Sequence, residues 1–426
     1  MAVGVGILGG GVVGGSLARR LLDDRAGIAA KTGLDLALVR VGVRDAARIR
    51  SFPSQYVTTD LAGLVEDPEV QLVVELMGGQ EPARALVMRA LDLGKPVVTA
   101  NKELVAADGP KLFDQAAERG VPLLFEAAVG GGIPLIRPLM ESLAGEKISR
   151  VLGIVNGTTN FILTEMDESQ ASFAQALARA QELGLAESDP SADVGGADAA
   201  AKAAILAGLA FGTWVGADNV HREGIEKLQS ADLAHARRLG YAVKLLAVAD
   251  ELQGRVVVRV HPAFIPLDHP LAAVRGATNA VFIEGPAVGR LLFSGPGAGG
   301  EPTATAVLGD VIDAARELLA GSKVTARIRF GDKEVGDFAK SSTRWYLRVE
   351  VADAPGVLSQ VAGVFGSHGV SIGSVWQDGR GDEATLILVT HEATEAAQRA
   401  AAADLADLAV VGQVAAAIRV EAPDPR

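Results

Sequence analysis

One short stretch of the chain places four acidic residues just ahead of a single lysine. Residues 184–202 read GLAESDPSADVGGADAAAK, and Lys202 is the only charged residue between positions 199 and 217. A helix that is apolar on every face is normally buried. A buried ammonium needs carboxylates nearby to stay charged, or its pKa falls and it becomes a proton carrier. We therefore predict that Lys202 and its acidic neighbours belong to an active site.

Two other interpretations of this segment are open. Asp198 and Lys202 lie four residues apart, the spacing of a helix-surface ion pair that contributes roughly 0.2–0.5 kcal/mol. The helix offers no polar face for such a pair, so we favour the active site. A membrane span is also disfavoured, because only 15 uncharged residues follow Lys202 and a bilayer requires ~20.

A second pattern consists of three glycines in ILGGGVVGGSL, at Gly9, Gly11 and Gly14. Placed between a strand and a helix, such glycines allow a tight turn and the close approach of a pyrophosphate to the helix N-terminus. Arg44 follows the second predicted strand, where an NAD site usually carries an acid. An arginine there favours the 2′-phosphate of NADP, with Arg40 as a second candidate and an ordinary charged strand end as the alternative.

Three further segments follow predicted strands. VVTANKEL puts Thr99, Ala100 and Lys102 at the carboxyl end of a sheet, where doubly wound proteins bind ligands. Glu126 runs into AAVGGGIP, a loop that could surround a monovalent cation or accommodate a nicotinamide. NGTTNFIL begins a helix at residues 156–163, and we expect Thr158 or Thr159 to be its N-cap.

Composition limits the classes of function. The 426 residues are 49% apolar and 22% charged, with a net charge of −12 and no cysteine. The acidic balance argues against nucleic-acid or anionic-membrane partners and favours small molecules. The lack of cysteine excludes disulfides, thiolate zinc sites, iron–sulfur clusters and covalent thiol catalysis. No targeting segment precedes the first strand, so we expect a cytoplasmic protein.

The elements that must position these residues fall into three domains. Residues 3–128 alternate apolar strands with helices, beginning with a helix over 12–30, which predicts a doubly wound parallel sheet of the Rossmann type. The next part mixes strands with helices, as an α+β domain; these helices are expected at 133–144, 158–166, 171–184, 198–212 and 230–240. The last part has the order strand, helix, strand, strand, helix, strand.

We place the domain limits at the changes of pattern. The dinucleotide-binding domain takes residues 1–130, and a helix over 302–320 could return to it. Residues 131–301 form the substrate-binding and dimerisation domain, 321–343 a polar linker, and 344–426 a small βαββαβ domain.

Taken together, these segments resemble homoserine dehydrogenase over most of the chain. The family's order is kept by GILGGGVVGG, VVELMGG, VVTANKEL, EAAVGGGIP, NGTTNFIL, DPSADVGGADAAAK and GAGGEPTATAV. The resemblance implies NAD(P)H-dependent reduction of L-aspartate 4-semialdehyde to L-homoserine, in the branch of amino-acid biosynthesis that leads to threonine, methionine and isoleucine. Physical chemistry agrees, because an amino aldehyde needs carboxylates for its ammonium and a proton donor for its oxygen.

The resemblance also implies roles for individual residues. Catalysis is assigned to Lys202, Lys102 and Asp198, and substrate binding to Glu187, Asp193, Asn156, Gly157 and Thr158. NADP, or NAD, would be bound by Gly9, Gly11, Val12, Val13, Gly14, Arg44, Met77, Gly78, Thr99, Ala100 and Lys102. A monovalent cation, Na⁺ or K⁺, would be bound by the backbone of Glu126, Val129, Gly131 and Ile133.

The terminal unit resembles an ACT domain, a regulatory module that binds amino acids. Its DAPGVL turn implies an effector site at Asp353, Gly356, Val357 and Leu358, and threonine is the expected effector. A bare interaction domain is the alternative. Because the first strand begins at residue 3, we expect a monofunctional enzyme without a preceding kinase. We also expect it to form a homodimer or homotetramer. The competing class of function is a non-catalytic amino-acid sensor built on a dinucleotide-binding scaffold.

Overall fold

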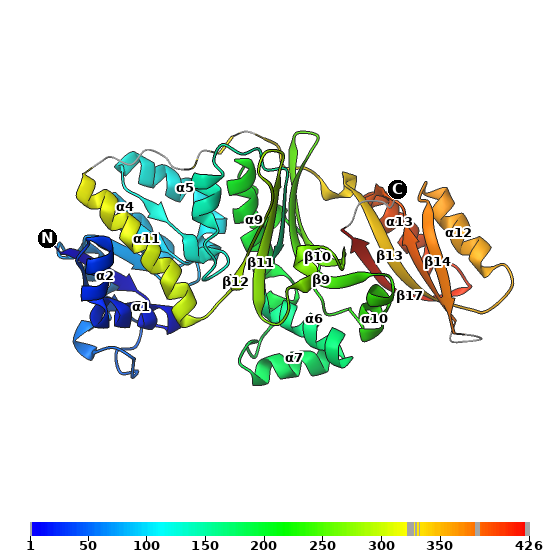
Figure 1. Cartoon of the computed structure of the whole chain (residues 1–426), viewed down its shortest axis with the longest axis horizontal. Helices are drawn as coiled ribbons and strands as arrows, with labels where there is room; N and C mark the ends of the chain where they lie inside the picture. Colours follow the sequence, from blue (N-terminus) through cyan, green and yellow to red (C-terminus); the bar gives the residue numbers. More distant parts are fainter. Residues whose placement is uncertain (1, 322–327, 329, 332, 380–383, 422–426) are drawn as a thin grey trace. The chain divides into compact units, whose positions relative to one another are not determined.

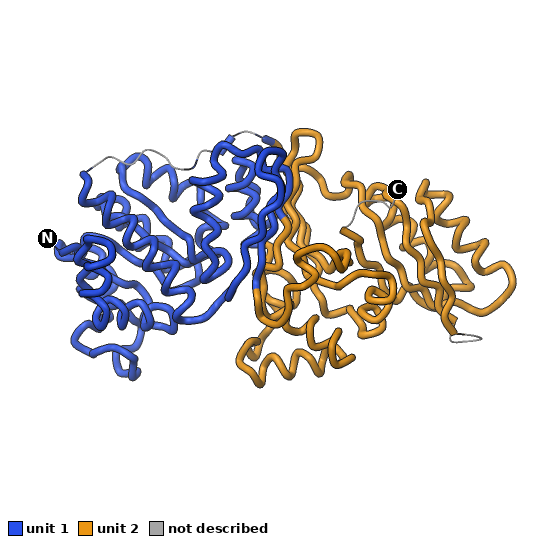
Figure 2. The backbone as a smooth tube through the Cα atoms, in the orientation of Figure 1, with its two compact units in different colours: residues 1–151, 201–218, 279–333 blue, residues 152–200, 219–278, 334–426 orange. Residues whose placement is uncertain are grey.

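The computed structural model describes the whole chain except residues 1, 322–327, 329, 332, 380–383 and 422–426. It divides into two compact units. Unit 1 comprises residues 1–151, 201–218 and 279–333, and unit 2 comprises residues 152–200, 219–278 and 334–426 (Figure 2). Part of the predicted linker falls on the residues outside the description. No helix of the described chain is long and apolar enough to cross a membrane.

Unit 1, which includes the blue N-terminal part of the chain in Figure 1, is built on a six-stranded parallel sheet in the order β3-β2-β1-β4-β5-β6. This order is that of a Rossmann fold, so the predicted doubly wound sheet is confirmed. The strands are β1 (Val3–Leu8), β2 (Leu36–Gly42), β3 (Val57–Thr58), β4 (Leu72–Glu75), β5 (Val97–Thr99) and β6 (Leu123–Leu124).

Helices cover both faces of this sheet. One face carries α1 (Val12–Asp23), α2 (Arg25–Thr32) and α11 (Gly300–Ala320), which share a core with β1 and β2. The other face carries α3 (Leu61–Glu66), α4 (Ala83–Asp92) and α5 (Lys102–Arg119). The strands β1 and β4 are fully buried, as expected for parallel strands covered on both sides. Unit 1 also contains β12 (Gly289–Pro296) and nearly all of β11 (Thr278–Gly285).

Unit 2 contains a sheet in which β9, β10, β17, β13, β15 and β14 are successive neighbours, with β7 next to β9. The long hairpin of β9 and β10 turns at Gln253 and Gly254, both with positive φ. The strands are β7 (Arg150–Ile154), β8 (His221–Arg222), β9 (Tyr241–Leu252), β10 (Arg255–Pro266), β13 (Ser342–Val351), β14 (Ile372–Asp378), β15 (Thr385–Thr390), β16 (Ala393–Thr394) and β17 (Val411–Val420).

The helices of unit 2 are α6 (Gly157–Ser169), α7 (Phe173–Glu182), α8 (Ser191–Val194), α10 (Ser230–Arg238), α12 (Val357–Ser367) and α13 (Glu395–Ala406). Helix α9 (Ala197–Phe211) is divided: residues 197–200 belong to unit 2 and residues 201–211 to unit 1. The C-terminal elements follow the expected order of strand, helix, strand, strand, helix, strand, with the short β16 added. Strand β17 pairs with β13 inside this part and with β10 outside it.

Two predicted helices differ from the structure. The helix expected over 12–30 is interrupted at Asp24, whose φ of −115° and ψ of 20° are not helical. The helix expected over 133–144 is shorter: helical backbone begins at Ile136, and Pro138–Ser142 winds as a π-helical turn closed by Leu143 N–H and the Pro138 carbonyl. Two prolines, Pro134 and Pro138, lack the N–H groups that a regular helix would use there.

Candidate active site

The acids of the 184–202 segment are organised by one asparagine in unit 2. Asn156 Nδ2 donates to Asp193 Oδ1 at 2.6 Å and to Asp198 Oδ2 at 2.9 Å. The Asn156 side chain is itself buried, while both aspartates are half-buried. The amide therefore fixes one oxygen of each carboxylate. We call Asp193 and Asp198 the acid pair.

Local chain geometry brings the acid pair together. Asp193 is the penultimate residue of the short helix α8, and Asp198 lies in the first turn of α9. Between them Gly196 has a φ of +80°, a left-handed conformation that favours glycine, and its N–H bonds to the Asp193 carbonyl at 3.0 Å. The turn at Gly195 and Gly196 therefore reverses the chain, so that Asp193 and Asp198 both reach the Asn156 amide.

Lys202 lies one helical turn after Asp198 on α9. Residues four apart share a helix face, so this lysine projects on the same side as the acid pair. The helix is buried along Ala203–Ala207, as predicted from its apolar sequence, and Lys202 is half-buried.

Asn156 also begins helix α6, which corrects a prediction. Its Oδ1 accepts from Thr159 N–H at 2.9 Å, so Asn156 is the N-cap, and neither Thr158 nor Thr159 has that position. An asparagine carbonyl reaches the third N–H of a helix as a threonine hydroxyl would. Gly157 is the first helical residue, and Thr158 Oγ1 donates to the Leu185 carbonyl at 2.8 Å.

A buried lysine that the sequence analysis missed anchors α6. Lys244 on β9 donates to Asn160 Oδ1 at 3.1 Å and to the Val274 carbonyl. Burial lowers the pKa of Lys244 to about 8. Asn160 Nδ2 bonds in turn to the carbonyl of Gly276 at 2.9 Å. The signal in the sequence was a single lysine within the apolar run YAVKLLAVA.

Glu187 is not brought to the acid pair by any contact among the described residues. It lies exposed in the loop between α7 and α8, where its carbonyl accepts from Gln181 Nε2 at 3.0 Å. Its predicted substrate-binding role stays a prediction.

The glycine-rich turn in unit 1 has the shape expected of a pyrophosphate site. Gly9 has a φ of +109°, and a Cβ on Gly14 would lie 1.9 Å from the Gly9 carbonyl oxygen, so both positions require glycine. A Cβ on Gly11 would meet no atom within 4 Å, so space is open in front of the helix. Within the described chain, no side chain caps α1, which leaves its first N–H groups to a ligand. Val12 is exposed and Val13 half-buried at this end.

A buried glutamate shapes the next loop of the sheet. Glu75 at the end of β4 accepts from Met77 N–H at 2.7 Å, from Gly78 N–H and from Thr99 Oγ1 at 2.6 Å. Burial raises the pKa of Glu75, although these hydrogen bonds oppose the effect. Gly78 has a φ of +74°. The sequence analysis named Met77, Gly78 and Thr99 but missed the carboxylate that holds them in place.

Lys102 begins helix α5 directly after this loop. Asn101 is the N-cap, since its Oδ1 accepts from Leu104 N–H at 3.1 Å, and its Nδ2 donates to the Gly79 carbonyl at 2.6 Å. Ala100 N–H bonds to the Glu75 carbonyl. The half-buried Lys102 is thereby tied to the carboxyl end of the sheet, where a ligand is expected.

Three arginines lie near the end of β2 and are candidates for binding the 2′-phosphate of NADP. Arg44 is exposed just beyond the strand, and Arg40 is exposed within it. Arg50, which the sequence analysis did not consider, lies closer to the glycine turn: a Cβ on Gly10 would be 3.1 Å from Arg50 Nε. That nitrogen is buried and has no hydrogen-bond partner among the described residues.

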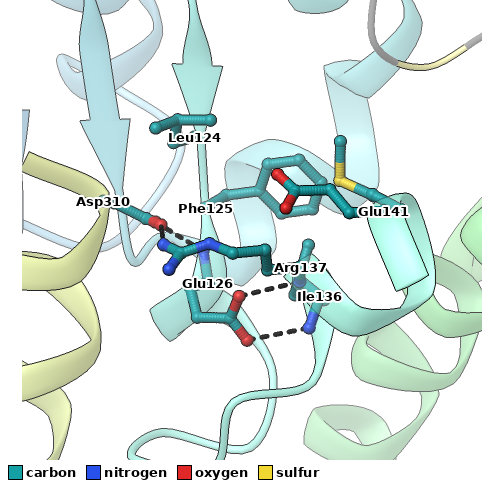
Figure 3. A pocket seen from close by; sticks show the side chains of 8 residues that line it. Leu124, Phe125, Glu126, Ile136, Arg137, Glu141 and Asp310 are labelled. Atoms are coloured by element: carbon teal, nitrogen blue, oxygen red, sulfur yellow. Dashed lines mark hydrogen bonds and ion pairs between the residues drawn. The ribbon is translucent and has the colours of Figure 1, made fainter. Parts of the chain in front are cut away.

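The carboxylate of Glu126 is committed to backbone groups in a small pocket of unit 1. It accepts from the N–H groups of Leu135, Ile136 and Arg137, as Figure 3 shows for the last two. Asp310 on α11 accepts from Glu126 N–H at 2.8 Å and pairs with Arg137 at 2.9 Å. Burial raises the pKa of Asp310 to about 7.

The loop after Glu126 is the predicted cation site. Gly130 and Gly131 both have positive φ, and Ile133 N–H bonds to the Gly130 carbonyl. Over the described residues no group of three His, Asp or Glu side chains gathers as a metal site. A cation here would therefore depend on carbonyl oxygens such as those of Glu126, Val129, Gly131 and Ile133, which are donors suited to Na⁺ or K⁺.

The predicted effector turn forms the start of α12. Gly356 has a φ of +90° and precedes the helix, Val357 is buried, and Leu358 is 46% exposed. Asp353 Oδ1 accepts from Gln377 Nε2 on β14 at 3.2 Å.

Comparisons with known proteins agree with this geometry. Three family models match: homoserine dehydrogenase over residues 134–312, homoserine dehydrogenase NAD binding domain over 9–126, and ACT domain over 345–410. The homoserine dehydrogenase of Mycobacterium tuberculosis is 48% identical over 430 residues, which is 98% of each chain. That of Corynebacterium glutamicum is 45% identical, covering 92% of this chain and 90% of its own.

Solved structures give the same result. The homoserine dehydrogenase from Thiobacillus denitrificans has a TM-score of 0.92 and 39% identity, over 99% of this chain and 98% of that chain. A hyperthermophilic archaeal homoserine dehydrogenase in complex with NADPH has a TM-score of 0.63 and 30% identity, over 74% of this chain and 98% of that chain. The members of the homoserine dehydrogenase family are NAD(P)-dependent oxidoreductases, and this chain also has a C-terminal ACT domain. Together with the glycine turn and the acid pair, these matches show that the chain belongs to the homoserine dehydrogenase family.

Proposed function

We propose that the acid pair binds the ammonium of L-aspartate 4-semialdehyde and that Lys202 and Lys102 handle the proton as its aldehyde is reduced to the alcohol of L-homoserine. The observation that supports this most is the Asn156 amide, which holds Asp193 beside Asp198, and Asp198 lies one helical turn before Lys202. Two carboxylates beside one ammonium donor suit a zwitterionic amino aldehyde. The first test is oxidation of NADPH with aspartate 4-semialdehyde; a non-catalytic amino-acid sensor would show none.

The roles of the individual groups follow from their chemistry. NADPH, when bound, supplies the hydride to the aldehyde carbon. A lysine ammonium donates a hydrogen bond to the carbonyl oxygen and then a proton to the alkoxide that develops there. The acid pair accepts hydrogen bonds from the substrate ammonium and fixes the substrate's orientation. Asp198 lies on the same face of α9 as Lys202, one helical turn before it.

For the cofactor, we propose a preference for NADP over NAD. Arg44 is exposed beyond β2, and the buried Arg50 Nε lies against Gly10, so the end of this strand offers two guanidinium groups to a 2′-phosphate. Arginine recognises phosphate through paired charge-assisted hydrogen bonds. The competing choice, NAD, predicts a higher kcat/KM with NADH than with NADPH.

The C-terminal part is proposed to bind threonine and to lower the activity. The support is the ACT match and a glycine with positive φ between β13 and α12. Titrating threonine against the full chain and against Asp353→Ala tests this; inhibition should weaken in the variant. Isoleucine and methionine serve as comparison ligands. If none of the three amino acids changes the activity of the full chain, the C-terminal part is better interpreted as an assembly domain.

Three further proposals accompany these. A monovalent cation binds to the carbonyls of the 126–133 loop, which predicts that activity in K⁺ or Na⁺ exceeds activity in tetramethylammonium at equal ionic strength.

The chain assembles as a homodimer or homotetramer, and sedimentation equilibrium would measure its oligomeric state. The cytoplasm is the expected location, as for the other enzymes of amino-acid biosynthesis.

A further inference from the structure

A cluster of charged side chains around the buried Arg419 in unit 2 joins the C-terminal elements to the segment that follows β8. Arg419 on β17 donates from Nη1 and Nη2 to the two carboxylate oxygens of Glu223, the second contact at 2.7 Å. His221 Nε2 lies 2.9 Å from the same carboxylate. Arg419 also pairs with Glu395, the first residue of α13. One guanidinium on the last described strand therefore holds two carboxylates from different elements.

The Arg419 guanidinium is rigidly placed. Its side chain is 3% exposed, and its centre lies 5.0 Å from the ring of Trp345 and 5.6 Å from the ring of Phe338. Burial by itself would raise the pKa of Glu223, yet hydrogen bonds from His221 and Arg419 hold that pKa well below its usual range. The Glu223–Arg419 pair is thus a fixed, charged connection.

The segment after Glu223 packs backbone to backbone on the glycine turn of the acid pair. Ile225 N–H bonds to the Val194 carbonyl at 2.9 Å. A Cβ on Gly224 would lie 2.3 Å from the Val194 carbonyl oxygen and 2.8 Å from Gly195 Cα, so no other residue fits there without moving the turn. Any displacement of Glu223 is therefore transmitted to residues 194–196.

That turn separates Asp193 from Asp198. We infer that Arg419 is a positioning residue for substrate binding: acting through Glu223, it holds the turn that sets the spacing of the acid pair. The inference rests on the proposed role of the acid pair in binding the substrate ammonium. It gives the C-terminal elements a physical route to the substrate acids, through one ion pair and one backbone contact, and an effector that shifts β17 or α13 would act through it.

The test compares steady-state constants of full-length variants. Glu223→Gln removes the negative charge that pairs with Arg419 but keeps the size of the side chain. We expect the KM for aspartate 4-semialdehyde to rise at least roughly fivefold, the lower end of typical coupling between sites. The KM for NADPH should stay within twofold of wild type, because the predicted cofactor residues lie in unit 1. Arg419→Lys, which keeps the charge but not the paired geometry, should give an intermediate KM.

A matched control separates positioning from stability. Arg348 on β13 pairs with buried Asp232 on α10 at 2.7 Å, which is another connection from the C-terminal elements that does not contact residues 223–226. Asp232→Asn should lower the unfolding temperature but leave the KM unchanged. Gly224→Ala crowds the same turn at the Val194 carbonyl and Gly195 Cα without removing a charge, and it should raise the KM even if Glu223→Gln fails to fold.

The outcomes distinguish this inference from the proposed site. If Asp193→Asn raises the substrate KM while Glu223→Gln and Gly224→Ala leave it within twofold of wild type, the positioning role is wrong and the site stands. If Asp193→Asn also has no effect, the acid pair does not bind the substrate and both ideas fail. A KM that rises equally in Asp232→Asn would show a general loss of stability and would also overturn the inference.

Discussion

The Asn156 side chain uses all of its hydrogen-bonding groups inside the protein. Its Oδ1 accepts from the N–H and the hydroxyl of Thr159, and its Nδ2 donates to both members of the acid pair. Like charges held close together repel, and a neutral amide between them offsets that cost. Asn156 is therefore better suited to arranging the substrate acids than to binding the substrate itself.

Two substitutions at Asn156 separate its role as the N-cap of α6 from its hydrogen bonds to the acid pair. Asn156→Ser keeps an N-cap oxygen but loses the donors to the acids, whereas Asn156→Ala loses both. We expect both variants to raise the KM for aspartate 4-semialdehyde, and only the alanine variant to lose roughly 0.5–2 kcal/mol of unfolding free energy. Steady-state kinetics and urea unfolding measure the two effects. A serine variant with the wild-type KM would show that the acids do not depend on the amide.

Lys202 is the residue on which the proposed proton transfer depends most. Lys202→Met is similar in length but cannot donate a proton, so kcat should fall by at least ~10²-fold, the lower end for general acid–base catalysis. NADPH binding, followed by fluorescence, should persist because the glycine turn is unchanged. Lys111→Met, at an exposed position on α5, is the control. A Lys202 variant within threefold of wild-type kcat would return this lysine to an ordinary helix-surface ion pair.

We also expect single residues to decide the choice between NADP and NAD. Arg44→Asp removes a charge-assisted hydrogen bond to a 2′-phosphate, of a kind that contributes about 1.5–3 kcal/mol, and adds repulsion. The ratio of kcat/KM for NADPH over NADH should fall by at least ~10-fold. An unchanged ratio in Arg44→Asp together with a lowered ratio in Arg50→Gln would move phosphate recognition to Arg50. Unchanged ratios in both variants would point to Arg40, or to no 2′-phosphate recognition at all.

Among the elements, the parallel strands were the most predictable from sequence. Their apolar runs, separated by helices, determine the sheet, and the glycine turn follows from its own spacing. The break at Asp24 could not be predicted, because a helical pattern of apolar residues continues through it. Glu75, Glu223 and Arg419 were missed since their importance lies in partners distant in sequence: Arg419 is 196 positions from Glu223. Sequence spacing reveals contacts within one helix or turn, but not contacts that only the fold creates.

The start of α13 gives the protein a dependence on acid. Glu395 is fully buried; burial raises its pKa, but hydrogen bonds from Arg419 and Arg399 outweigh this and lower the pKa to about 2. A depressed carboxyl pKa stabilises the folded state fully above its unfolded value near 4.5, and this contribution is lost as pH falls towards 2.

The variant Glu395→Gln should therefore flatten the pH dependence. Between pH 5 and 3 the unfolding free energy of the wild type should fall more steeply, by up to ~1.4 kcal/mol per pH unit. Urea unfolding across this range measures the slope, and Glu392→Gln, three residues earlier and exposed, is the control. Equal slopes in wild type and Glu395→Gln would mean that the buried carboxyl is not ionised in the folded chain.

For the molecule as a whole, the structure divides the chain differently from the sequence pattern. The pattern predicts a C-terminal module that follows a linker, whereas unit 2 combines residues 334–426 with residues 152–200 and 219–278. Strand β17 pairs with β10, and Arg348 and Arg419 supply the partners of Asp232 and Glu223. The module is thus part of the fold around the acid pair.

A chain that ends at Ser341 is consequently expected not to fold stably. It leaves the fully buried Asp232 without Arg348, and breaking one such pair costs about 3–5 kcal/mol. That is a large share of the ~5–15 kcal/mol by which proteins are stable. Circular dichroism and activity of the truncated chain measure this. A monodisperse truncated enzyme with wild-type kcat would show that the module is separable after all.

The position of β17 also has a consequence for synthesis on the ribosome. This strand is the last one that the structure describes, yet it completes the edge of β10, which ends at Pro266. At ~5–20 residues per second, roughly 8–30 s pass between the emergence of the two strands. During that interval the nascent chain presents an open strand edge and an unneutralised carboxylate at Glu223. We therefore expect the yield of this protein in cells to fall when chaperones that bind nascent chains are depleted.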